Sequence, residues 1–75
     1  MRITVKLVGG FVQTMGFSQK ELDVAPGSTV GDVLALLAID PARPKIVALN
    51  GQAVAEAEEV HEGDRVLVSH VFSGG

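Results

Sequence analysis

Residues 61–75 read HEGDRVLVSHVFSGG and combine a turn, a strand and an unusual ending. Gly63-Asp64 marks the turn, and the apolar, β-branched run over residues 65–71 predicts a strand. The sequence then stops at Gly74-Gly75. Glycine loses more backbone freedom on ordering than any other residue, so a terminal pair after a strand stabilises no fold. The ending therefore needs a functional explanation.

A hairpin precedes this stretch, where residues 47–54 read VALNGQAV. Asn-Gly between apolar runs is a strong short-range signal for a two-residue hairpin turn. We therefore expect a strand over residues 46–49, a turn at Asn50-Gly51 and a second strand over residues 52–54. The polar residues 55–62 then lead to the final turn.

The first third of the chain predicts another hairpin. Residues 2–7 alternate polar with apolar side chains, which is typical of a half-buried strand with Ile3, Val5 and Leu7 facing inward. Residues 18–24 predict the second strand, with Leu22 and Val24 on one face. The glycines at both ends of residues 9–16 predict a loop between them.

A single main helix is expected between the two hairpins. Thr29, followed three residues later by Asp32, fits a capping box. The apolar positions after it repeat at i, i+3, i+4 and i+7, the spacing of one helix face: Val30, Val33, Leu34 and Leu37. Asp40-Pro41 ends this pattern.

The order of these elements predicts an α+β fold in which one mixed sheet carries the main helix on one face. The first and last strands would then be neighbours in the middle of the sheet. A ubiquitin-like β-grasp satisfies this order, as would another small α+β topology. We expect a single domain over residues 1–75, with a flexible C-terminal tail at about residues 72–75.

Composition excludes several classes of function. The 75-residue chain has no Cys, so disulfides, thiolate catalysis and Cys-ligated metals are excluded. Its net charge is −3 and no Lys/Arg cluster is present, which argues against a nucleic-acid partner. Met1 leads directly into a strand pattern, and no apolar run approaches the ~18 residues of a membrane span. We therefore expect a cytoplasmic protein with no leader peptide and no membrane partner.

Together, the Asn50-Gly51 hairpin, the Glu62-Gly63-Asp64 turn, the apolar strand at residues 66–68 and the Gly-Gly ending resemble the closing half of the MoaD/ThiS family of sulfur carriers. The order of the remaining elements extends this resemblance over the whole chain. Proteins of that family resemble ubiquitin in fold and also end in Gly-Gly. The resemblance implies a carrier protein that is not an enzyme.

The resemblance also implies the chemistry of the tail. In the family, an ATP-dependent, E1-like adenylating enzyme forms an acyl-adenylate on the terminal glycine, here Gly75. Sulfur from a persulfide donor then replaces AMP and leaves a thiocarboxylate. The carrier binds no cofactor and contributes no catalytic side chain, and ATP is used by the activating partner.

The length and composition of the tail suit that chemistry. Six extended residues, 70–75, span roughly 20 Å, enough to reach a recessed active site. Gly74 lacks a Cβ and allows a narrow channel around the tail, and we expect Phe72 and Ser73 to contribute to its recognition.

An apolar docking surface is a further expectation. If Val66 and Val68 face the helix, alternation places Leu67, Ser69 and Val71 on the opposite face of the sheet. Contiguous exposed apolar area on a small protein usually marks a partner site. The alternative is that these side chains complete the core or lie flat on the sheet.

Other chemistry is less well supported by the sequence. His61, Glu62 and Asp64 could be drawn as a metal site, but neighbouring polar residues in a turn are far more often solvated surface. The glycines at residues 9–16 lack the Lys-Ser/Thr of a phosphate-binding loop. We therefore expect no metal and no catalytic residue.

Two pathways and two other functions remain open. The long first hairpin looks more like the molybdopterin carriers, whose sulfur recipient is the large subunit of molybdopterin synthase. The short connection after the helix looks more like the thiamine carriers, which serve thiazole synthase. Of these two pathways, we prefer the molybdopterin pathway. The alternatives are a protein modifier that joins Gly75 to a target lysine and a non-covalent β-grasp interaction module.

Overall fold

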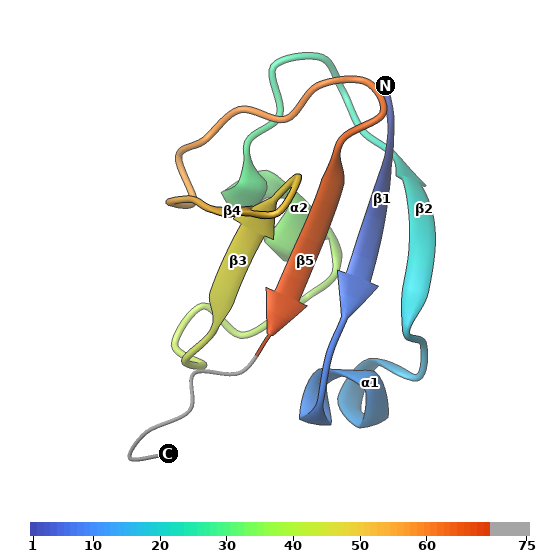
Figure 1. Ribbon diagram of the computed structural model, residues 1–75, viewed down its shortest axis with the longest axis vertical. Coiled ribbons are helices and arrows are strands. Elements are labelled where there is room, and N and C mark those ends of the chain that lie inside the picture. Colours follow the sequence, from blue (N-terminus) through green and yellow to red (C-terminus); the bar gives the residue numbers. More distant parts are fainter. Residues whose placement is uncertain (70–75) are drawn as a thin grey trace.

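The structure is a computed structural model that describes residues 1–69 of the chain. In chain order the elements are β1 (Arg2–Leu7), α1 (Gly10–Met15), β2 (Gln19–Asp23), α2 (Val30–Leu36), β3 (Ile46–Leu49), β4 (Gln52–Ala53) and β5 (Arg65–Ser69). Within the described residues the strands form one sheet in the order β2-β1-β5-β3-β4 (Figure 1). The helix α2 covers one face of this sheet.

The first and last strands are parallel neighbours at the centre of the sheet, as the order of elements predicts. The expected first hairpin is confirmed because β1 and β2 pair antiparallel, from Arg2 opposite Asp23 to Lys6 opposite Gln19. On the other side, β3 pairs antiparallel with both β5 and β4. Parallel pairing at the centre requires a crossover between the first hairpin and the rest, and α2 supplies it.

The helix α2 begins where its sequence predicts. The Thr29 hydroxyl accepts a hydrogen bond from the Asp32 N–H at 3.2 Å, and the Asp32 carboxylate accepts one from the Thr29 N–H at 2.9 Å. This reciprocal pair is the expected capping box. The helix ends as Ala38 takes a positive φ of 57° and the Ile39 N–H donates to the Leu34 carbonyl at 3.1 Å.

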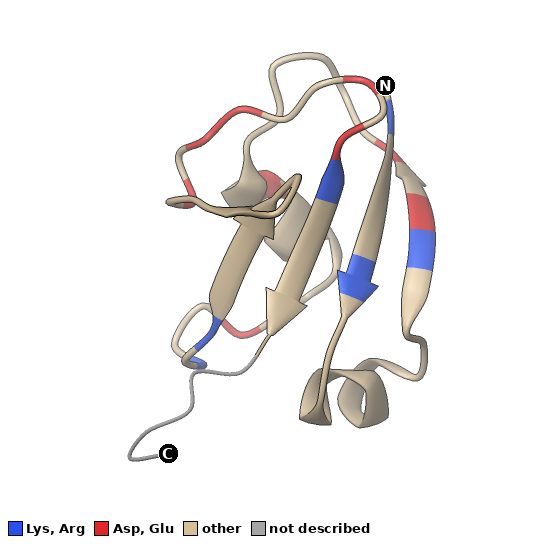
Figure 2. Cartoon of the chain, in the orientation of Figure 1, with Lys and Arg blue, Asp and Glu red and all other residues tan. Residues whose placement is uncertain are grey.

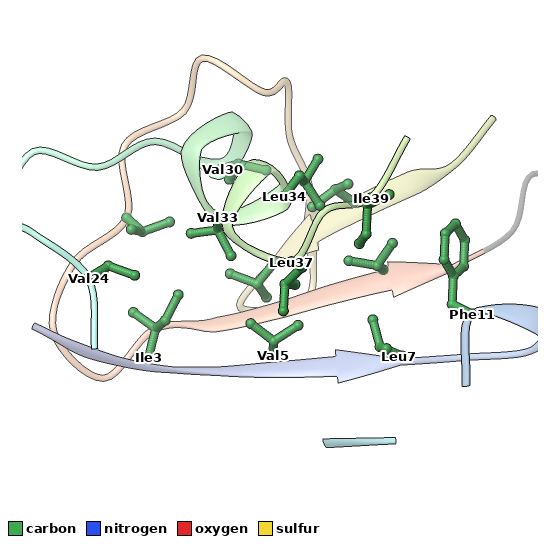
Figure 3. Close-up of a cluster of buried hydrophobic side chains, with 14 residues drawn as sticks. Ile3, Val5, Leu7, Phe11, Val24, Val30, Val33, Leu34, Leu37 and Ile39 are labelled. Carbon is green, nitrogen blue, oxygen red and sulfur yellow. The ribbon is translucent and has the colours of Figure 1, made fainter. Parts of the chain in front are cut away.

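The core lies between α2 and the sheet (Figure 3). Apolar side chains of the helix point toward the inward side chains of β1 and β5. The buried set contains all seven inward positions predicted for β1 and α2: Ile3, Val5, Leu7, Val30, Val33, Leu34 and Leu37. The expectation for β2 holds less completely, because Val24 is buried but Leu22 is half-buried at the sheet edge.

The sequence prediction of a plain loop over residues 9–16 was wrong, because this segment contains α1. Gly9 has a φ of 68° and Gly16 one of 81°, so both ends use backbone angles that favour glycine. Between them, the Phe11 side chain is completely buried at the end of the core. A six-residue helix without a side-chain cap has little stability of its own, so we attribute it to the burial of Phe11.

The hairpin turn and the last strand follow the prediction with small differences. Asn50 and Gly51 have φ values of 53° and 85°, the two positive angles that an Asn-Gly hairpin turn uses. The strand β4 ends at Ala53, one residue before the predicted end. Within the described residues, β5 extends to Ser69, and the predicted continuation to Val71 and the expected tail at residues 72–75 lie outside them.

Candidate functional site: the open face of the sheet

Alternation along β5 separates two environments. Val66 and Val68 are completely buried beneath α2, whereas Leu67 and Ser69 are half-buried on the opposite face. The predicted facing of the strand is therefore confirmed for Leu67 and Ser69. We call this uncovered side of the sheet the open face.

Strand register places the neighbours of Leu67 on the open face. Lys6 of β1 lies beside it in one direction and Ala48 of β3 in the other, followed by Ala53 of β4. This row crosses four strands and is apolar apart from the one cation. Leu67 therefore lies at the centre of the open face, with a cation on one side and small apolar residues on the other.

The open face is hollowed around this row. An open hollow of about 860 Å³ extends over β1, β5 and the β3–β4 turn. The side chains and backbone that line it are those of Thr4, Lys6, Val8, Gln19, Asn50, Gly51, Arg65, Val66 and Leu67. This lining combines an apolar centre with polar and cationic groups, and a partner side chain could enter it.

Two exposed apolar residues that the sequence reasoning missed extend the open face toward the end of β5. Val8 is 39% exposed, and its N–H donates to the Val68 carbonyl at 3.0 Å. Ile46 is 46% exposed and lies opposite Ser69 in the antiparallel register. Alternation along the first and third strands could have indicated both, since they follow the outward positions of those strands.

At the start of β5, a hydrogen-bond network joins the Asn50-Gly51 turn to the turn at Asp64. The Asn50 amide donates to Asp64 Oδ1 at 3.0 Å, and its carbonyl oxygen accepts from the Arg65 N–H at 2.9 Å. The hydrogen bond from Asn50 lowers the pKa of the Asp64 carboxyl below its ordinary 3.8. Partial burial opposes this shift, while the backbone N–H of His61, at 2.7 Å, adds to it. The network fixes the start of β5 and hence the register that places Leu67.

The residues predicted to carry the chemistry, Gly74 and Gly75, lie outside the described residues, as do Val71, Phe72 and Ser73. The structure does show where the chain reaches position 69. Ser69 ends the described part of β5 between Val8 and Ile46, at the end of the sheet that also carries α1 (Figure 1). The apolar part of the open face therefore lies at the point from which the tail continues.

The polar turn with His61, Glu62 and Asp64, which could be drawn as a metal site, lies at the start of β5. His61 Nε2 is 3.6 Å from Glu59 Oε1, and His61 Nδ1 is 3.9 Å from Asp64 Oδ2. Within residues 1–69, no group of three or more His, Asp or Glu side chains is arranged to hold a metal ion. In the same part of the chain, no helix has both the length and the apolar character needed to cross a membrane.

Comparison with known proteins defines the class of protein. A model of the ThiS family matches residues 5–75, and the chain therefore belongs to this family of ubiquitin-fold sulfur carriers. Members of the family are small carrier proteins and not catalytic subunits. A search of curated proteins found no match.

Solved structures agree with the ubiquitin-like β-grasp fold. SAMP1 from Haloferax volcanii is 28% identical, with a TM-score of 0.83 and 100% of both chains covered. A ubiquitin from Caldiarchaeum subterraneum is 29% identical, with a TM-score of 0.63, and 100% of this chain and 98% of that chain are covered. A protein in the complex of subunits 1 and 2 of the molybdopterin-converting factor from Helicobacter pylori matches with a TM-score of 0.71, and 100% of each chain is covered. Its identity is 15%, so this likeness shows the fold alone.

Proposed function

We propose that this protein carries sulfur as a thiocarboxylate on Gly75. The observation that supports the proposal most strongly is the ThiS family match, which runs through the Gly-Gly ending to residue 75. The fold agrees with a carrier role, because the described part of the central strand β5 ends at Ser69, six positions before this ending in the sequence. The folded part then serves for recognition, and the chemistry takes place on the tail.

The proposed reaction begins at the carboxylate of Gly75. An ionised carboxylate resists nucleophiles, so an oxygen of this group first attacks the α-phosphate of ATP and releases pyrophosphate. A persulfide sulfur then displaces AMP from the acyl-adenylate and forms an acyl disulfide. A second thiol supplies the two electrons that cleave this disulfide and release the thiocarboxylate. Every catalytic group in these steps belongs to the partners.

The open face is the proposed docking surface for the adenylating enzyme. Leu67 and Ser69 lie on it, and Val71 continues their alternation in the sequence. Docking there would hold the body outside the active site while Phe72, Ser73 and Gly74 enter the channel. The hollow around Leu67 supports this assignment, because it offers room for a partner side chain beside an apolar anchor.

For the recipient of the sulfur, we propose the large subunit of molybdopterin synthase in preference to thiazole synthase. The long first hairpin supports this choice, because it looks more like that of the molybdopterin carriers. Sulfur transfer from the loaded protein to each recipient, measured side by side, would distinguish the two pathways. Faster transfer to thiazole synthase would overturn the preference.

A protein modifier is the second candidate function. Its support is the similarity to SAMP1 and to an archaeal ubiquitin, both above 25% identity. A modifier and a sulfur carrier share the first step, which is adenylation of the terminal glycine. They differ in the group that the activated glycine finally joins: sulfur for a carrier, and a lysine amine of another protein for a modifier. A gain in mass at a lysine of another protein would identify the modifier.

Deletion of Gly75 tests the carrier function directly. The protein is incubated with ATP, the adenylating enzyme of the same organism and a persulfide donor, and its intact mass is measured. We expect the full chain to gain the mass difference of one sulfur for one oxygen. The deletion withdraws the carboxylate by roughly 3.5 Å, so loading should fall by about a hundredfold or more.

Circular dichroism provides the control, because a terminal glycine contributes no packing and the melting temperature should not change. Equal loading of the two proteins, or no loading of the full chain, would contradict the proposal.

A further inference from the structure

The charge of the open face differs in sign from that of the whole protein. The chain carries a net charge of −3, and many of its carboxylates lie on the loop between β4 and β5 (Figure 2): Glu56, Glu58, Glu59, Glu62 and Asp64. That loop lies beside the start of α2, to which it is joined by a hydrogen bond from the Val30 N–H to the Glu58 carbonyl at 2.8 Å. The negative charge is therefore concentrated at the end of the molecule away from the end of β5.

The open face has a positive excess that remains after its own ion pair is considered. Arg2 is 3.4 Å from Asp23 across β1 and β2, so these two charges offset each other. Glu21 lies opposite Thr4 and therefore on the same face, where it contributes one negative charge at the edge of the sheet. Two more cations, Lys6 and Arg65, line the hollow. Within residues 1–69, no side-chain ion pair involves either of these two residues.

The two cations flank the proposed apolar anchor. Lys6 is the register partner of Leu67 on β1. Arg65 precedes Leu67 by two residues on β5 and therefore points to the same side of the sheet. The centre of the open face is thus a leucine with one exposed cation beside it on β1 and a second exposed cation two residues earlier on β5.

We infer that Lys6 and Arg65 make the open face selective for a partner surface that carries carboxylates around an apolar recess for Leu67. This inference rests on the proposed function, in which the adenylating enzyme docks on the open face. Charge complementarity identifies the partner: the open face carries three cations and two carboxylates, and the two cations beside Leu67 attract an acidic surface, whereas the acidic loop repels it.

The expected effect lies mainly in the rate of association. Exposed ion pairs contribute little to affinity, since water and salt screen them. The same charges steer an encounter and accelerate association at low ionic strength. Because the acidic loop ends at the start of β5, whereas Lys6 and Leu67 lie farther along the sheet, the field of the protein also turns this part of the open face toward an acidic partner. The tail would then arrive on the side from which it can enter the active site.

Lys6→Glu and Lys20→Glu form a matched pair for the test. Each changes the net charge by the same amount and each replaces an exposed lysine on a strand. Lys20 is on β2, on the side of the sheet opposite to Lys6, with its Nζ 5.5 Å from the centre of the Phe17 ring. Its replacement therefore alters the total charge without altering the open face. Lys6→Gln, which removes the charge without reversing it, is the milder variant in case the reversal disturbs β1.

The association rate with the adenylating enzyme of the same organism is measured by stopped-flow fluorescence in about 20 mM and about 500 mM NaCl, where the screening length falls from about 20 Å to about 4 Å. In low salt we expect Lys6→Glu to slow association about tenfold and Lys6→Gln about threefold, whereas Lys20→Glu changes it less than twofold. The differences should disappear in high salt. Thermal melting of each variant shows that the fold is retained.

Equal slowing by Lys6→Glu and Lys20→Glu would overturn the inference, since total charge and not the open face would then matter. Association rates that do not depend on salt would overturn it as well. In both cases the proposed function stands if the wild-type protein still gains sulfur on Gly75. If the wild-type protein neither binds the enzyme nor gains sulfur, the proposed function fails and this inference fails with it.

Discussion

The two faces of β5 differ in what their side chains do, although their residues alternate along a single five-residue strand. Val66 and Val68 are completely buried against α2, and they hold the sheet and helix together. Leu67 is equally apolar but lies half-buried on the open face, beside Lys6 and within the hollow. Apolar character alone therefore does not separate residues that stabilise this fold from residues that are available to a partner. The strand period of two residues separates them.

The largest expected effect is a loss of stability on substitution of Val66, on the buried face of β5. Val66→Asp would bury a charge without a counter-ion, at a cost of about 4 kcal/mol or more. A domain of this size has a total stability of only about 5 kcal/mol, so we expect the variant to retain about 1 kcal/mol or less at 25 °C and to unfold in little or no urea. Urea unfolding followed by circular dichroism measures this. A cooperative transition at the wild-type midpoint would show that the assigned facing of β5 is wrong.

The same substitution one residue later should affect binding and not folding. Leu67→Asp places a carboxylate on the open face, where a surface change usually costs within about 0.5 kcal/mol of stability. If Leu67 enters a recess of the adenylating enzyme, binding should weaken by about 2 kcal/mol, or roughly 30-fold. Calorimetric titration against that enzyme measures the loss.

Leu36→Asp is the matched control for this variant. Leu36 is a 64% exposed leucine on α2, which covers the other side of the sheet. We expect it to bind normally. Normal binding by Leu67→Asp would remove Leu67 from the docking surface, and equal losses by both variants would indicate a nonspecific effect of the added charge.

The smallest expected effect concerns the network that fixes the start of β5. Because its pKa is lowered in the folded protein, the Asp64 carboxylate stabilises the fold above pH 3.8, and this contribution is lost as the pH falls below that value. Asp64 accepts from Asn50 with one carboxylate oxygen and from the His61 N–H with the other, whereas the side chain of Asn has a single acceptor oxygen. We therefore expect Asp64→Asn to lose about 1 kcal/mol of stability at pH 7. The stabilities of the two proteins should converge toward pH 3.

Asp23→Asn is the comparison for this effect, since Asp23 makes an exposed ion pair with Arg2 and its loss should cost within about 0.5 kcal/mol. Urea midpoints measured from pH 3 to pH 7 test both expectations. A constant difference between wild type and Asp64→Asn across this range would contradict the role of the carboxylate charge.

The elements that the sequence predicts well are those whose signals are local. The Thr29 and Asp32 capping box marks the start of α2, because both hydrogen bonds join residues three positions apart. The Asn50-Gly51 turn likewise depends on the backbone angles of two adjacent residues. Alternation in β1 and β5 identifies their buried faces for the same reason. These predictions are confirmed because each depends on neighbours along the chain.

The helix α1 and part of the open face depend on contacts between distant segments. Phe11 is buried at the end of the core. The guanidinium carbon of Arg43, which lies in the connection between α2 and β3, is 4.0 Å from the centre of the Phe11 ring. No local pattern in residues 9–16 predicts this contact, because its two partners are distant in the sequence. Val8 and Ile46 likewise become neighbours of the end of β5 only because β1 and β3 both pair with it.

The sequence by itself determined the order of the strands and main helix, the cap of α2, the hairpin turn and the inward residues of β1 and β5, together with the resemblance to the sulfur carriers. The Gly-Gly ending and its proposed chemistry are also features of the sequence, since residues 70–75 lie outside the described part of the structure. Only the tertiary structure decided that Lys6, Arg65 and Leu67 share one hollow with Val8. The physical reason is that strand pairing joins residues about sixty positions apart, and no local propensity reports such a distance.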